Sequence, residues 1–157
     1  MKKLPKILLF ATAMGLAGAA AAQALKPEDK VKFRQAAYNF MAWNMEKIKA
    51  QVVDGSAPFD QAQVAAAANA IAAAANSGMG ALYSPDTVGV VGFHKSRLKK
   101  EFFEQPDQVR EIAINFTEQA NKLAEIAAMG DKAEIAQQFG EVGKACKACH
   151  DKFRMKD

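Results

Sequence analysis

Residues 135–153 read IAQQFGEVGKACKACHDKF. Apolar residues and cysteines recur in this stretch at spacings of three and four, which is the spacing of one face of an α-helix. They are Ile135, Phe139, Val142, Cys146, Cys149 and Phe153. The stretch therefore predicts a helix near the end of the chain that carries both cysteines of the protein on its apolar face.

The run Cys146-Lys147-Ala148-Cys149-His150 has the haem attachment pattern of c-type cytochromes. On a helix the positions i and i+3 point the same way, so the thiols of Cys146 and Cys149 can reach the two vinyl groups on one side of a porphyrin. His150 lies one turn after Cys146 and can place an imidazole nitrogen under the iron. The pattern predicts one haem c per chain, bound covalently through both cysteines, with His150 as the axial ligand.

Two other uses of the cysteine pair are less consistent with the sequence. A thioredoxin-type redox pair belongs where a strand leads into a helix, and no strand pattern precedes Cys146. A zinc site needs further ligands, and His94 is the only other histidine. His94 itself is flanked by polar residues in a loop and is interpreted as a solvated surface histidine.

Helical periodicity continues upstream, with almost no strand signal. Three further helices are predicted over residues 27–53, 60–75 and 107–129. Residues 76–106 form a long irregular segment, in which a short helix is expected over 95–103. With short first and third connections, the predicted fold is all-α: an antiparallel up-down four-helix bundle with covalently attached haem c.

The first 24 residues have the pattern of a secretory signal peptide. A basic start is followed by an uncharged apolar run from Ile7 to Ala22, with cleavage expected after Ala22 or Ala24. Residues 25–157 would then form the single mature domain. The chain has 21 Lys and Arg against 17 Asp and Glu, and the signal holds three of the lysines, which leaves 18 against 17. This balance argues against nucleic-acid binding. The signal predicts export to the periplasm, and the lack of a second long apolar run predicts a mature protein that is soluble and binds no membrane.

The expected mature sequence resembles the cytochromes c′, the four-helix-bundle haem proteins of bacterial periplasms. The resemblance rests on KFRQ at 32–35, NSGMG at 76–80, FGEVG at 139–143 leading into the haem motif, and Phe153-Arg154 beyond it. It implies a homodimer through the first two helices and a pentacoordinate, high-spin iron. It also implies that nitric oxide and carbon monoxide bind in a small distal pocket. The implied roles are NO binding or detoxification and electron transfer with an unidentified periplasmic redox partner.

The same resemblance assigns roles to individual residues. It implies that Arg34 and Gln35 lie near the haem propionates, that Arg97 and Glu101 lie near the haem edge, and that Arg154 lies beside His150.

Tyr38 stands at the distal position, where many members of the family have leucine and some have an aromatic residue. We expect its ring to shield the iron, so that an entering gas pushes it aside and strains the first helix. If the wide apolar face of that helix forms the dimer contact, gas binding would loosen the dimer. The other interpretation is that Tyr38 is ordinary core packing.

An alternative function remains open. Met41 and Met45 share a helix face with Tyr38, and a thioether from either, or another distal ligand, would close the iron and give a six-coordinate, low-spin electron carrier. A Tyr38 phenolate ligand would need a depressed pKa, and Arg34 is the only cation expected nearby to lower it. Ordinary core packing is the simpler role for both methionines, with Met41 also a candidate lining residue of the distal pocket.

Trp43 lies off this face and is expected to pack between helices or between subunits. No nucleophile with a paired base is present, so conventional enzyme activity is not expected, although NO reduction or weak peroxidase activity at an open haem is conceivable.

Overall fold

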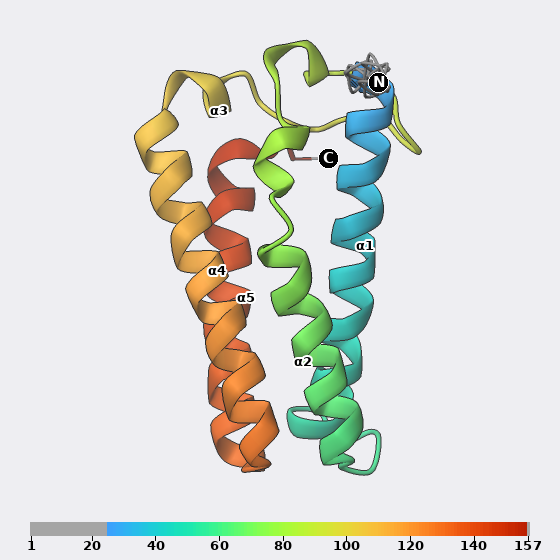
Figure 1. Ribbon diagram of the computed structural model, residues 1–157, viewed down its shortest axis with the longest axis vertical. Coiled ribbons are helices and arrows are strands. Elements are labelled where there is room, and N and C mark those ends of the chain that lie inside the picture. The colour runs from blue at the N-terminus through green and yellow to red at the C-terminus, as the bar shows by residue number, and fades with distance from the viewer. Residues whose placement is uncertain (1–24, 157) are drawn as a thin grey trace, which may run out of the picture.

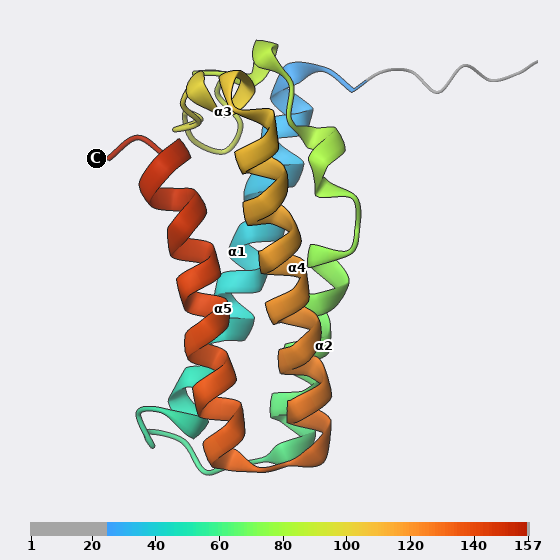
Figure 2. The same cartoon turned by 90° about the vertical axis from the view of Figure 1, so that its left-hand side faces the viewer.

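The fold is a bundle of four long helices with a linker across one end (Figure 1). The structure is a computed structural model that describes residues 25–156, and the expected signal peptide lies outside the described residues. The helices are α1 (Pro27–Val52), α2 (Gln61–Ala75), α3 (Glu101–Glu104), α4 (Pro106–Met129) and α5 (Lys132–Phe153). Figures 1 and 2 show α1, α2, α4 and α5 running side by side in alternating directions, which confirms the predicted antiparallel bundle.

The helix starts follow from local sequence. Pro27 lies in the first turn of α1 and Pro106 in that of α4, where proline has no intrahelical hydrogen bond to lose. The Asp60 side chain accepts from the backbone N–H of Gln63 at 3.1 Å and caps α2. Asp131 caps α5 in the same way. The predicted ends of the long helices are confirmed to within about one residue by these boundaries.

The core fills the space between the four long helices. Side chains in it that are at most 1% exposed include Ile48, Val64, Ile71, Leu123, Ile135 and Val142. Burying an aliphatic side chain of this size stabilises the fold by about 1.5–3 kcal/mol. Two of the alanines of α2, Ala67 and Ala68, are also buried, and their small size lets neighbouring helices approach α2 closely.

The linker from residue 76 to 105 contains two short 3₁₀ helices, η1 (Met79–Leu82) and η2 (Pro85–Thr87). The helix expected over 95–103 is wrong for its first six residues, because only Glu101–Glu104 are helical. Residues 97–99 instead run alongside the end of the chain. The backbone N–H of Lys99 donates to Phe153 O at 2.9 Å, and that of Met155 donates to Arg97 O at 2.8 Å. Backbone pairing with the tail thus replaces the hydrogen bonds that a helix would have made.

Within residues 25–156, no helix combines the length and the apolar character needed to cross a bilayer. Both the α1–α2 and α4–α5 connections lie at one end of the bundle. The long linker and the last turn of α5 lie at the opposite end (Figure 2). The haem motif is therefore at the linker end, beside the start of α1.

The turn between α4 and α5 depends on a glycine. Gly130 has φ +86°, and a Cβ there would lie 2.5 Å from the side chain of Gln61. Gly140 lies inside α5, and a Cβ there would meet nothing within 4 Å.

We predict that Gly130→Ala lowers the free energy of unfolding by about 1–2 kcal/mol, because a left-handed backbone is strained for alanine. Gly140→Ala should raise it by about 0.5–1 kcal/mol. Urea unfolding of both variants checks this, and equal effects would contradict it.

Candidate functional site

The two thiols lie one turn apart near the end of α5. Neither Cys146 nor Cys149 is in a disulfide, and both are partly buried. Burial raises the pKa of both thiols, and the charge of Cys149 raises the pKa of Cys146 further. Desolvation lowers the pKa of the neighbouring His150, with a second contribution from the positive charge of Arg97. His150 therefore favours the neutral form, which is the form that binds a metal.

Tyr38 of α1 lies close to these thiols. Charges on Cys149 and Cys146 both act on its phenol and contribute to raising its pKa, although desolvation is the main cause. The residue is 38% exposed. The Tyr38 hydroxyl is 2.7 Å from the hydroxyl of Tyr83 in the linker, and either group can be the donor. The end of α5 and the middle of α1 thus contribute to one site.

Arg34, one turn before Tyr38, is buried and attaches the linker to α1. Its exposed fraction is only 6%. Its guanidinium donates to Leu82 O at 3.2 Å and to Ser96 Oγ at 3.0 Å, with a longer contact of 3.4 Å to Thr87 Oγ1. The guanidinium carbon also lies 4.4 Å from the centre of the Tyr83 ring. The expected haem-propionate residue is therefore also the residue around which the linker folds.

Gln35 makes a second attachment between α1 and the linker. Its Nε2 donates to His94 O at 2.8 Å, and its Oε1 accepts from the backbone N–H of Phe93 at 2.8 Å. Gly92 is pressed against α1, since a Cβ there would lie 2.6 Å from Gln35 Oε1 and 3.0 Å from Lys32 N. The His94 side chain is exposed, in agreement with its interpretation as a surface histidine.

Aromatic rings connect the linker to α5. Tyr83 stacks on Phe102 of α3 at 4.6 Å between ring centres and 14° between planes. Phe102 meets Phe153 edge to face at 5.5 Å, and Phe153 is 2% exposed at the end of α5. Sequence reasoning missed Tyr83 and Phe102. The only signal for them is two aromatic residues in an irregular segment, which has no periodicity to indicate their partners.

Of the other expected site residues, Arg97 and Arg154 lie around the last turn of α5. Arg97 acts on the pKa of His150 through its charge, as noted above. The backbone N–H of Arg154 donates to His150 O at 3.2 Å, and Leu98 pairs with Arg154 as an isolated bridge. Glu101 is the first residue of α3 and is partly exposed.

Met41 and Trp43 have different environments. Met41 is 5% exposed and belongs to the core cluster, against which Met45 packs. Trp43 is 57% exposed, with Lys47 Nζ 3.8 Å from its ring centre. Trp43 therefore does not pack between the helices of one chain, and of its two expected roles only packing between subunits remains.

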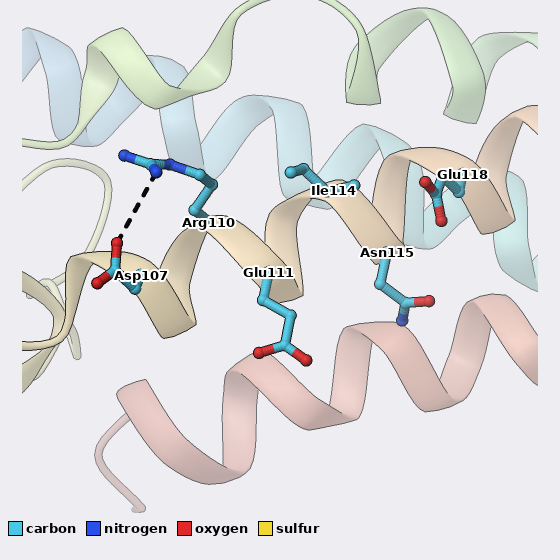
Figure 3. A pocket seen from close by; sticks show the side chains of 6 residues that line it. All are labelled: Asp107, Arg110, Glu111, Ile114, Asn115 and Glu118. Atoms are coloured by element: carbon cyan, nitrogen blue, oxygen red, sulfur yellow. Dashed lines mark ion pairs between the residues drawn. The ribbon is translucent and has the colours of Figure 1, made fainter.

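A shallow hollow of about 400 Å³ lies on the surface of α4. Figure 3 shows its six labelled residues, all of them on that helix, including Asp107 and Arg110, which form an ion pair of 3.8 Å. None of the thiol, imidazole or phenol groups described above lines it. This hollow is not part of the candidate site.

The donor set at the end of α5 fits a haem. Two unpaired thiols one turn apart suit two thioether bonds, and the adjacent neutral imidazole suits an iron ligand. Among residues 25–156 no group of three His, Cys, Asp or Glu side chains is arranged to hold a metal ion.

Comparisons with known proteins agree with this interpretation. The family model described as cytochrome c′ matches residues 29–154. The cytochrome c′ of Allochromatium vinosum is 52% identical over 144 residues, which cover 92% of each chain. A solved cytochrome c′ with an unusual ligand-controlled dimer dissociation is 52% identical, with a TM-score of 0.79 over 84% of this chain and 98% of its own. A nitric oxide complex of a mutant cytochrome c′ from Alcaligenes xylosoxidans is 32% identical, with a TM-score of 0.72 over 83% and 98%.

The buried guanidinium generates a stability prediction. Arg34→Leu removes its hydrogen bonds and leaves Leu82 O and Ser96 Oγ without this donor, so we expect a loss of about 2–4 kcal/mol. Arg110→Leu, in an exposed ion pair, should cost less than about 1 kcal/mol. Urea unfolding measures both. Hydrogen exchange should show faster exchange at residues 82–96 in the Arg34 variant alone, and unchanged protection there would contradict the assigned role.

Proposed function

The chain belongs to the cytochrome c′ family, and on this premise we propose that its mature form, residues 25–157, is a periplasmic haem c protein that binds nitric oxide and carbon monoxide. When bound, the haem supplies an iron atom that can accept a diatomic gas and change its charge by one electron. The observation that carries the proposal is that the end of α5 and the middle of α1 lie beside each other. There, charges on Cys146 and Cys149 of α5 act on the phenol of Tyr38 of α1.

We assign the attachment to three residues of α5. Cys146 and Cys149 would form the two thioether bonds, and His150 would be the axial ligand on one side of the iron. Their support is the spacing on one helix, the unpaired thiols and the neutral imidazole. Arg97 and Arg154, close to His150 along the paired tail, would adjust the charge around that ligand.

Arg34 and Gln35 would hold the linker against α1 and would also lie near the haem propionates. Both hold the linker against α1 by hydrogen bonds. A guanidinium has five N–H donors, so the contacts of Arg34 leave further donors for a carboxylate such as a haem propionate. Glu101, at the start of α3, would lie near the haem edge, an assignment that rests on the family resemblance alone.

On the opposite side, the proposal leaves the iron without a protein ligand. Met41 is packed in the core with Met45 against it, which disfavours the six-coordinate electron carrier. Desolvation raises the pKa of Tyr38, which disfavours the phenolate form that would bind iron. Tyr38 would therefore cover the gas position without bonding to the iron. Met41 would form the core wall behind it.

We propose gas binding, with a role in NO detoxification or electron transfer, in place of conventional catalysis. NO reduction and weak peroxidase activity remain compatible with an open iron. The redox partner would be another periplasmic protein.

A homodimer through α1 and α2 completes the proposal. Phe33, Phe40 and Trp43 of α1 are 54%, 49% and 57% exposed. Large apolar side chains exposed on one helix are typical of an interface with another copy or partner. The similar cytochrome c′ with ligand-controlled dimer dissociation supports a dimer that responds to a bound ligand.

Haem attachment and gas binding are tested on the purified mature protein. We expect its mass under denaturing conditions to exceed that of the peptide by one haem. The Cys146→Ser, Cys149→Ser double variant should lose this added mass, because no thiol remains for a thioether. The reduced protein should then take up one NO per chain in a spectroscopic titration. A peptide-only mass would contradict the attachment, and an unchanged spectrum under NO would contradict the gas site.

The dimer is tested by sedimentation velocity. Trp43→Glu would bury an unpaired charge in the interface, so we expect it to weaken the dimer at least about tenfold. Phe93→Glu, at a 67% exposed position in the linker, is the matched control and should remain dimeric. Adding NO to the wild type should shift the dimer toward monomer. Identical behaviour of the two variants would contradict the interface, and a dimer unaffected by NO would contradict its coupling to gas.

A further inference from the structure

Tyr83 holds the phenol of Tyr38 in place. The two hydroxyl groups are 2.7 Å apart, although 45 residues separate them in the chain. Tyr38 lies on a continuous helix, whereas Tyr83 lies in the linker between η1 and η2. A hydrogen bond of this length fixes one defined position of the Tyr38 side chain.

The ring of Tyr83 is itself held by neighbours. Phe102 stacks on it at 4.6 Å, and the Arg34 guanidinium carbon lies 4.4 Å from its centre. Phe102 in turn contacts Phe153 at 5.5 Å, and Phe153 is buried at the end of α5. Two contacts thus hold the Tyr83 ring in place, so a displacement of Tyr38 would break the bond between the two hydroxyl groups.

Both phenols are neutral near pH 7. Desolvation is the main cause that raises the pKa of Tyr38, and it raises the pKa of Tyr83 well above the ordinary value. The bond between them is thus an ordinary hydrogen bond between neutral groups. Breaking one such bond changes an equilibrium constant by about 2- to 10-fold.

We propose that Tyr83 is a positioning residue for gas binding, because it holds Tyr38 in the covering position and so lowers the affinity for the gas. This inference rests on the proposed function and deepens it, because it names a residue that sets part of the free energy needed to displace Tyr38. Gas entry displaces Tyr38, and the Tyr38–Tyr83 hydrogen bond opposes that displacement. The aromatic contacts of Phe102 and the cation of Arg34 keep Tyr83 in place meanwhile.

The test is a double-mutant cycle on the reduced haem protein with carbon monoxide as the probe. Tyr83→Phe removes one hydroxyl and keeps the ring stack, whereas Tyr38→Phe removes the other and keeps the cover. Each single variant should bind CO about 2- to 10-fold more tightly than the wild type. The double variant should bind no more tightly than either single one, since all three lack the same bond.

Ser84→Ala is the matched control. It removes the neighbouring hydrogen bond from Lys30 Nζ to Ser84 Oγ, 2.9 Å long, and leaves both phenols intact. Its CO affinity should equal that of the wild type.

Ultraviolet resonance Raman spectra give a readout that does not depend on affinity. The tyrosine bands of the ligand-free wild type should report a hydrogen-bonded phenol pair, and CO binding should shift them in the direction that Tyr83→Phe does.

The outcomes separate the two claims. Tighter CO binding in both single variants without further gain in the double supports the positioning role. A Tyr83→Phe variant with wild-type affinity, or additive gains in the double variant, overturns it while gas binding stands. A wild type that binds no CO overturns the proposed function and this inference together.

Discussion

Arg34 is a buried cation whose hydrogen-bond partners in the protein are all neutral groups of the linker. Among residues 25–156 the buried polar side chains are arginine, asparagine, glutamine, threonine and serine, with no aspartate or glutamate. A buried charge is stable only when surrounding dipoles replace water. The linker supplies these dipoles through a backbone carbonyl, two hydroxyl groups and the face of Tyr83. The path of the linker is therefore set by the need to solvate one guanidinium.

Several features of the site depend on that constraint. Folding around Arg34 brings Tyr83 within hydrogen-bonding distance of Tyr38, one turn further along α1. It also brings the linker to the end of α5, where Phe102 packs on Phe153 and residues 97–99 pair with the tail. Tyr38, the linker and the end of α5 are thus in contact with one another at one end of the bundle. The opposite face of α1 carries Trp43 and other exposed aromatic side chains, so one helix joins the proposed gas site to the proposed interface.

The sequence was sufficient for the long helices and for the position of both cysteines near the end of the last one. Each long helix is specified by residues close together in the sequence, such as the Asp60 cap and the apolar period from Ile135 to Phe153. Such signals can be recognised without knowing which distant residues the helix will contact. The linker was not predictable in this way. Ser96 gives no local signal of its contact with Arg34, 62 residues away, and residues 97–99 are not helical because they pair with the chain end. Tyr83 gave no signal, because its role arises only from contacts with Tyr38, Arg34 and Phe102. The roles of Arg97, Glu101 and Arg154 toward the haem come from family resemblance and stay predictions.

The central claim is that the protein leaves the iron open on the side of Tyr38, because Met41 is packed in the core and burial disfavours the phenolate form of Tyr38. The most direct measurement is the absorption spectrum of the purified protein, oxidised and reduced, with no added gas. The account predicts a high-spin Soret band and a single broad visible band in the reduced form. Sharp, split alpha and beta bands in the reduced protein would show a low-spin iron closed by a protein ligand and would contradict the account.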